Sequence, residues 1–130
     1  MHLSGLPCDI DKIMEIANKN KLYVVEDCAQ AHGAISGRSH VGTTGDFGAF
    51  SFYPTKNLGG LGDGGAVTCN KKDMACKINM LRNYGSLHRY SHEIVGVNSR
   101  LDEIQAAFLS VKLKYLDKIN THKERLAKIY

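Results

Sequence analysis

The sequence has no long hydrophobic run, because none of its apolar stretches approaches the ~20 residues that a membrane-spanning helix needs. It also shows no signal peptide, since Met1 is followed by polar and turn-forming residues. We therefore expect a cytoplasmic protein with no membrane partner.

The sequence lacks any close pair of cysteines, and this spacing argues against two kinds of site. No C-x-x-C pair occurs, so neither a zinc site nor a disulfide framework is supported. Free thiols without an export signal are typical of the cytoplasm. A metal site built from Asp27, Cys28 and His32 matches no metal-ligand spacing, so we expect no metal. The cysteines are Cys8, Cys28, Cys69 and Cys76.

Charge of one sign does not dominate the sequence, whose net charge is only +4. Much of the positive charge lies between Lys112 and Lys128, where Asp117 and Glu124 interrupt it. This pattern favours a solvated helix face over a nucleic-acid surface, so nucleic acid is not an expected partner.

Periodic patterns in the first part of the chain predict a helix and a strand. Asp9 can cap a helix over residues 10–20, in which apolar residues recur at helical spacing. The short apolar run LYVVE, residues 22–26, indicates a buried parallel strand.

Two further strands are predicted in the middle of the chain. Residues 47–53, FGAFSFY, alternate in polarity, which places Phe50 and Phe52 on one face of a strand and Ser51 on the other. GGAVTC, residues 64–69, is the next strand.

The second half of the chain is mainly helical in pattern. Apolar residues at helical spacing over 74–81 indicate a helix that Gly85 can terminate. Ser99 and Asp102 resemble a capping box that opens a long helix, with a break expected near Asn120. Helices alternating with strands indicate an α/β layer architecture.

Polar residues directly after the apolar run are the first candidates for chemistry. Asp27 is expected at the carboxyl end of a strand, where open α/β sheets bind ligands. A carboxylate there can hold a cationic ring nitrogen or a metal, or simply cap a helix. Gln30 can orient a ligand hydroxyl, and His32 can be an acid–base group or a structural loop histidine.

The second group of candidates lies on and after the predicted strand 47–53. The Ser51 hydroxyl can bind phosphate or be satisfied by its own neighbours. Lys56 can form a covalent bond if desolvation or cationic neighbours deprotonate its amine, or it can be an ordinary surface lysine. The glycines of 59–65 allow a close approach of backbone to ligand or form a tight turn, but they match no nucleotide-binding fingerprint.

Three ordered blocks, VVEDCAQAHGA, GDFGAFSFYPTKNLGGLGDGGAV and GVNSRLDEIQAAFL, resemble the DegT/StrS family of nucleotide-sugar aminotransferases. The resemblance extends over nearly the whole chain. It implies the α/β fold of aspartate aminotransferase (fold type I), in which a mostly parallel sheet flanked by helices binds pyridoxal 5'-phosphate. The chain is then part of the large, cofactor-binding domain.

The resemblance also implies a role for each candidate. Lys56 matches the amine that bonds covalently to pyridoxal phosphate. Asp27 matches the carboxylate that pairs with the protonated pyridine nitrogen and keeps the ring an electron sink. Gln30 matches the residue that contacts the ring hydroxyl, and Ser51 matches a phosphate ligand. Asn98 matches an asparagine that crosses a homodimer interface to the partner's cofactor phosphate, so the active site is shared.

The implied reaction transfers an amino group from an amino acid, usually glutamate, to a nucleotide-linked keto-sugar. Residues 84–118 look most similar to members that act on dTDP-linked 3-keto-6-deoxyhexoses. One alternative is a pyridoxamine-phosphate-dependent sugar dehydratase of the same family; those relatives have histidine in place of the lysine, so Lys56 argues against it. Another alternative is an inactive remnant that serves only as a structural or interaction module.

Length is the main departure from the family, whose members have several hundred residues. Residues 1–130 lack the upstream phosphate loop, the first strands of the large domain and the C-terminal small domain. We therefore expect a central piece of such an enzyme. A smaller departure is Ser4, which stands where the family pattern H-x-Y-G has an aromatic residue.

Overall fold

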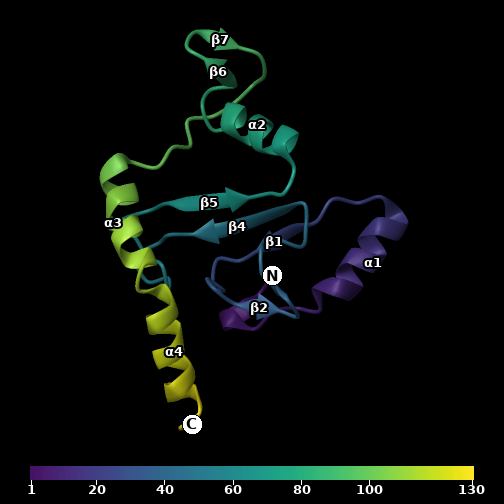
Figure 1. Cartoon of the computed structure of the whole chain (residues 1–130). Coiled ribbons are helices and arrows are strands. Elements are labelled where there is room, and N and C mark those ends of the chain that lie inside the picture. Colours follow the sequence, from purple (N-terminus) through teal and green to yellow (C-terminus); the bar gives the residue numbers. More distant parts are fainter.

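The computed structural model describes the whole chain, residues 1–130, as a small sheet with helices beside it and two short hairpins (Figure 1). None of its helices has the length and apolar character required to cross a bilayer. The elements follow in this order: η1 (a 3₁₀ turn, Leu3–Gly5), α1 (Ile10–Asn20), β1 (Val25–Asp27), β2 (Ile35–Ser36), β3 (Ser39–His40), β4 (Phe47–Ser51), β5 (Gly65–Thr68), α2 (Lys72–Leu81), β6 (Ser86–His88), β7 (Ser91–His92), α3 (Glu103–Leu113) and α4 (Leu116–Ala127).

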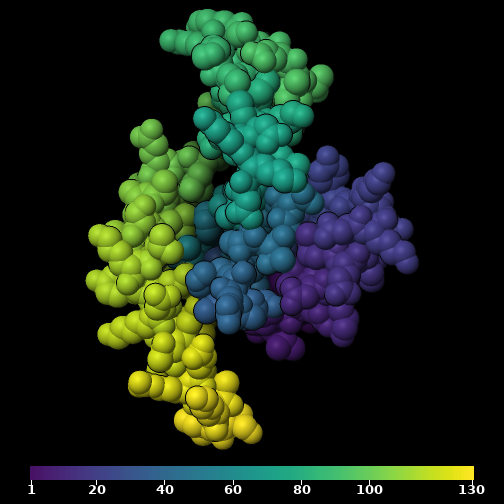
Figure 2. All heavy atoms as spheres, turned by 45° about the vertical axis from the view of Figure 1, so that its right-hand side comes forward, coloured from purple at the N-terminus to yellow at the C-terminus, as the bar shows by residue number.

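The molecule is elongated, with the sheet in its centre. Figure 1 shows α1 on one side of the sheet and α3 and α4 on the other. The space-filling view shows α2 with the β6–β7 hairpin projecting at one end and the last part of α4 projecting at the opposite end (Figure 2). The N-terminus lies close to β1, because His2 N donates a hydrogen bond to Asp27 O over 2.9 Å.

The central sheet has the strand order β1-β4-β5 and contains one parallel and one antiparallel pairing. β1 and β4 are parallel, with Asp27 opposite Ala49, whereas β4 and β5 are antiparallel. Because β1 and β4 run in the same direction, their carboxyl ends meet at one edge of the sheet, where α/β proteins place ligand sites. The antiparallel β5 confirms the strand predicted at 64–69.

The prediction of a buried strand over 22–26 is wrong in extent and in burial. β1 spans only three residues, and Glu26 is its one buried member. Tyr23 is 74% and Val25 62% exposed. The physical reason is that β1 is an edge strand of this sheet, and nothing within the chain covers the face that carries Val25.

Two helix predictions are confirmed by their capping contacts. The Asp9 side chain caps α1 by accepting a hydrogen bond from Lys12 N at 3.3 Å. α2 ends at Leu81, and Gly85, with a φ of 75°, donates its N–H to Met80 O over 2.8 Å. A positive φ there suits glycine, which has no Cβ to clash.

The prediction of a capping box at Ser99 and Asp102 is wrong. The helix begins later, at Glu103, and the Asp102 side chain makes no capping hydrogen bond. Ser99 is engaged elsewhere, because its N–H donates to Arg82 O at the end of α2 over 2.9 Å. The backbone of Ser99 therefore contacts α2 and does not begin α3.

The predicted break near Asn120 is also wrong, because α4 runs through that residue without interruption. The helices are instead separated at Lys114 and Tyr115. Leu109 of α3 and Leu116 of α4 are both buried against Leu58, so the burial of apolar side chains on both helices sets the bend.

Two small apolar clusters form the core. Phe50 packs against the first cluster and Phe52 against the second, which confirms that these two rings avoid the face of Ser51. The first cluster consists of Cys28, Ala31 and Val41, with Ala34 and Phe50 beside it. The second consists of Leu58, Leu109 and Leu116, with Phe52 and Leu101 beside it.

Candidate functional site

Asp27 and Ser51 lie on the same face of the sheet. Asp27 pairs with Ala49 across the parallel ladder, and residues in register on neighbouring strands point to the same side. Ser51 follows Ala49 by two residues and therefore points to that side as well. Asp27 is exposed and Ser51 is half-buried. A carboxylate and a hydroxyl thus face a common space beyond the carboxyl ends of β1 and β4.

The Gln30 side chain is oriented by the N-terminal turn. Its Oε1 accepts a hydrogen bond from the backbone N–H of Ser4 at 3.0 Å. Ser4 has a φ of 53°, a left-handed conformation that is uncommon for a residue with a side chain. Because the amide oxygen is occupied, the Nε2 hydrogens are left to donate to a ligand. Ser4 acts through its backbone, which explains why its side chain can depart from the aromatic family pattern.

Lys56 lies in a turn directly after β4 and is half-buried. Its N–H donates to Tyr53 O over 2.9 Å, which closes the turn. α3 fastens the glycine-rich segment that follows. Gln105 Oε1 accepts from Leu61 N at 2.7 Å, and Lys112 Nζ donates to Gly59 O at 2.6 Å. The lysine is therefore carried by a loop with fixed ends.

His32 is a buried imidazole near Lys56. Its ring lies 5.5 Å from the ring of Phe50 and 6.2 Å from that of Phe52, centroid to centroid. Neither ring nitrogen has a hydrogen-bond partner of good geometry. Burial lowers the pKa of His32 below its usual value. The nearby Ser51 carbonyl oxygen raises this pKa to a smaller extent, whereas the positive charge of Lys56 lowers it further. Of the two interpretations open from the sequence, this geometry supports a neutral, packed histidine.

Asn98 does not lie with the other candidates. It pairs with Asn83 in an isolated bridge at the base of the β6–β7 hairpin. It also lines a separate cavity of about 890 Å³ between the sheet, α2 and residues 98–102. Asn98 is exposed to solvent. Its contact with a partner's cofactor stays a prediction.

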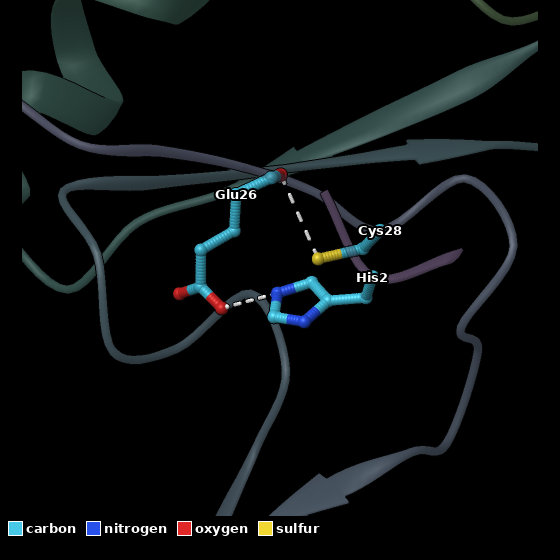
Figure 3. Close-up of side chains that lie close together, drawn as sticks. All are labelled: His2, Glu26 and Cys28. Atoms are coloured by element: carbon cyan, nitrogen blue, oxygen red, sulfur yellow. Dashed lines mark hydrogen bonds and ion pairs between the residues drawn. The ribbon is translucent and has the colours of Figure 1, made fainter. Parts of the chain in front are cut away.

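Sequence reasoning missed a buried hydrogen-bond cluster around Glu26 (Figure 3). Glu26 Oε2 lies 2.9 Å from His2 Nε2 and accepts from Gly42 N at 2.8 Å. Its Oε1 accepts from Thr44 N at 2.9 Å and from Gly45 N at 2.6 Å. Burial raises the pKa of Glu26, but the hydrogen bonds from the three backbone amides and from His2 outweigh it, so the pKa lies below its usual value.

The same cluster includes Cys28, and its three side chains are close enough together to hold a metal ion. Their donors and acceptors are already in use, however. His2 Nδ1 accepts from Cys8 N at 3.2 Å, and Cys28 Sγ donates to Glu26 O over 3.6 Å (Figure 3). We interpret the cluster as structural. It joins residues 24 positions apart, and no local sequence pattern marks it.

Comparison with known proteins identifies the class of protein. The model of the DegT/DnrJ/EryC1/StrS aminotransferase family matches residues 1–130, and the chain belongs to this family. The dTDP-3-amino-3,4,6-trideoxy-alpha-D-glucose transaminase of Streptomyces venezuelae is 50% identical over 100% of this chain and 34% of that protein. The dTDP-3-amino-3,6-dideoxy-alpha-D-galactopyranose transaminase of Aneurinibacillus thermoaerophilus is 55% identical over 100% of this chain and 36% of that protein.

Solved structures agree with this assignment. DesV of S. venezuelae superimposes with a TM-score of 0.86 at 52% identity, covering 90% of this chain and 32% of its own. NtdA of Bacillus subtilis, solved with bound cofactor PMP, gives 0.79 at 34% identity, covering 88% of this chain and 26% of its own. The predicted family and fold class are confirmed, and the family's enzymes depend on pyridoxal phosphate. The chain spans about a third of the length of the curated relatives it matches.

Proposed function

We propose that this chain is the central part of the cofactor-binding domain of an aminotransferase that transfers an amino group from an amino acid to a nucleotide-linked keto-sugar. The observation that carries the proposal is the placement of four polar residues at one edge of the sheet. Asp27 and Ser51 are the last residues of β1 and β4, and Gln30 and Lys56 follow within a few positions.

The chemistry of these four residues fits pyridoxal phosphate. The exposed carboxylate of Asp27 can pair with a protonated pyridine nitrogen. The free Nε2 of Gln30 can donate to a ring oxygen, since Ser4 holds its Oε1. Ser51 Oγ accepts from Tyr53 N at 3.2 Å, so its O–H is left to donate to a phosphate. When bound, pyridoxal phosphate supplies an electron sink that stabilises a carbanion at the substrate carbon.

Lys56 has two tasks in this proposal. Its amine would hold the cofactor at the aldehyde carbon, and the same amine would accept and deliver the proton of the substrate. Its turn is partly buried, and its charge is close enough to His32 to lower the pKa of that imidazole. Because an amine at this position is essential to both tasks, Lys56 favours transamination over the dehydratase alternative, in which the family has histidine.

We further propose a homodimer in which Asn98 reaches the cofactor phosphate of the partner. Asn98 is exposed and lies apart from the four residues of the proposed cofactor site, and this position supports the arrangement. We propose a dTDP-linked 3-keto-6-deoxyhexose as acceptor, glutamate as donor and the cytoplasm as location. The names of relatives at 50% and 55% identity support this substrate class.

Borohydride trapping tests the proposed function. The purified chain is incubated with pyridoxal phosphate and reduced, and the pyridoxyl group is located by peptide mass mapping. We expect label on Lys56 in the parent and its loss in Lys56→Ala, with Lys19→Ala on the exposed surface of α1 as the matched control. Label spread evenly over surface lysines in a folded sample would contradict the assignment and favour an inactive module.

A further inference from the structure

We propose that Asn120 of α4 is a positioning residue that fastens the loop carrying Lys56 to the loop carrying Gln30. It would thereby fix the separation between the two parts of the cofactor site. The inference rests on the proposed function of Lys56 and Gln30, and it goes beyond that function because Asn120 belongs to neither loop.

Two hydrogen bonds from one amide connect the loops. Asn120 Oδ1 accepts from Asn57 Nδ2 at 3.1 Å, and Asn57 is the residue next to Lys56. Asn120 Nδ2 donates to His32 O at 2.8 Å, and His32 follows Gln30 by two residues. The amide therefore bridges segments that lie 63 and 88 positions before it in the sequence.

The direction of these hydrogen bonds is set by a lysine. Lys123, one turn further along α4, donates from Nζ to Asn57 Oδ1. That contact orients the Asn57 amide with its NH₂ group toward Asn120, so the Asn120 oxygen must accept and its nitrogen must donate to His32. These contacts form a chain of hydrogen bonds from Lys123 through the two asparagine amides to His32 O, and each hydrogen bond polarises the next. Neither aspartate nor leucine can reproduce both contacts of Asn120.

Packing around Asn120 is close on the side of the Gln30 loop. Gly33 has a φ of 82°, and a Cβ added there would lie 2.6 Å from Asn120 Nδ2. A side chain at residue 33 would force the Asn120 amide to move away from this loop, and the positive φ also favours glycine there. Gln30, His32, Asn57 and Asn120 also line one cavity of about 520 Å³, so the bridging amide borders the space between the two loops.

The residue type itself points to a tertiary role. Asparagine is a weaker helix former than alanine, leucine or lysine. A break in the helix near this position is expected from the sequence. The structure keeps a continuous helix, and the two long-range hydrogen bonds account for the side chain. Helix stability alone does not explain an asparagine here.

The test measures the reactivity of the Lys56 amine in the cofactor-free chain. Parent and variants are labelled with trace acetic anhydride at a temperature at which all are folded, and each lysine is quantified by mass mapping. Asn120→Leu removes both contacts, whereas Asn120→Asp keeps only the acceptor for Asn57. Asn18→Leu and Asn18→Asp on the exposed surface of α1 are the matched controls.

We expect Lys56 labelling in Asn120→Leu to rise about fivefold relative to Lys19, because a lost hydrogen bond loosens its loop. Asn120→Asp should show a smaller rise, and the Asn18 variants none. Asn57→Ala should give a similar rise that does not add to that of Asn120→Leu, since both act through one contact. Additive effects, or an unchanged Lys56-to-Lys19 ratio in a variant that merely melts earlier, overturn the proposal.

Failure of the proposed function gives a different result. Acetylation needs no cofactor, so it reports on Asn120 even in a chain that does not trap pyridoxal phosphate. Absence of trapping at Lys56 in the parent contradicts the proposed function, whereas an unchanged labelling ratio in Asn120→Leu contradicts the role of Asn120.

Discussion

His2 Nε2 and Glu26 Oε2 are 2.9 Å apart in a site that excludes solvent almost completely, since the two side chains are 0% and 1% exposed. The pair connects the N-terminal segment to β1 immediately before Asp27. A buried carboxylate with four hydrogen-bond donors is stable only as long as the donors stay in place. This pair therefore helps to fix the backbone that carries the proposed ligand of the pyridine nitrogen.

We predict that Glu26→Gln destabilises the chain by about 3 kcal/mol, because two of the four donors would then face an NH₂ group. Urea unfolding of the variant measures this loss. Glu15→Gln on the exposed surface of α1 is the matched control and should change stability by less than about 0.5 kcal/mol. A loss below about 1 kcal/mol for Glu26→Gln would show that the backbone amides find other acceptors.

Acid should destabilise the chain first through His32. Burial, with a contribution from Lys56, lowers its pKa in the folded chain below the ordinary 6.5. At a pH between the folded and the unfolded pKa of His32, the unfolded chain binds a proton at this residue and the folded chain does not. The contribution of neutral His32 to the free energy of unfolding is therefore complete above pH 6.5 and falls as the pH decreases below that value. The slope is at most about 1.4 kcal/mol per pH unit.

His32→Leu should remove this slope just below pH 6.5, and urea unfolding at several pH values measures it. His122→Leu on exposed α4 should keep it. The pKa of Glu26 is also lowered, so its contribution is complete above 4.5 and is lost at still lower pH. An identical pH profile for the parent and His32→Leu would contradict the buried neutral imidazole.

Cys28 should be the last cysteine to react with iodoacetamide in the native chain. Burial, together with the negative charges of Glu26 and Asp27, raises the pKa of its thiol to about 11. Cys76 is exposed and should react first. Mass mapping of alkylated peptides with and without urea measures both rates. Reaction of Cys28 at the rate of Cys76 without urea would show that the core around β1 opens readily.

Gly33→Ala should destabilise the chain more than Gly37→Ala. Both glycines have a positive φ, 82° and 61°, so backbone strain affects both variants. A Cβ at Gly33 meets Asn120 Nδ2, whereas a Cβ at Gly37 meets nothing within 4 Å. We expect Gly33→Ala to lower the free energy of unfolding by about 1–2 kcal/mol more than Gly37→Ala does, as measured by denaturant unfolding. The extra loss should disappear in an Asn120→Ala background, and its persistence there would place the clash elsewhere.

Asp27→Asn should slow amino transfer about a hundredfold in an active preparation while leaving cofactor trapping at Lys56 nearly unchanged. The reason is that the carboxylate stabilises the protonated ring during the reaction more than it contributes to cofactor binding. Single-turnover kinetics with glutamate measure the first quantity and borohydride trapping the second. Transfer at the parent's rate would remove Asp27 from the proposed mechanism.

The sequence by itself determined those features that depend on neighbouring residues. The Asp9 cap of α1, the alternation that separates Phe50 and Phe52 from Ser51, and the glycine that follows α2 are all local effects of side-chain and backbone geometry. Three ordered motifs also identified the family over the whole chain. The placement of Asp27 at the end of a strand followed from the apolar run before it.

Only the tertiary structure decided the features that join distant segments. Ser99 bonds to Arg82 and forms no capping box, and Asn120 is held in a continuous helix by Asn57 and His32. The burial of Glu26 with His2 has the same origin. In each case a polar group gains a partner far away in the sequence, and this gain outweighs a local preference of under about 1 kcal/mol. Periodicity and propensity contain no information about such partners.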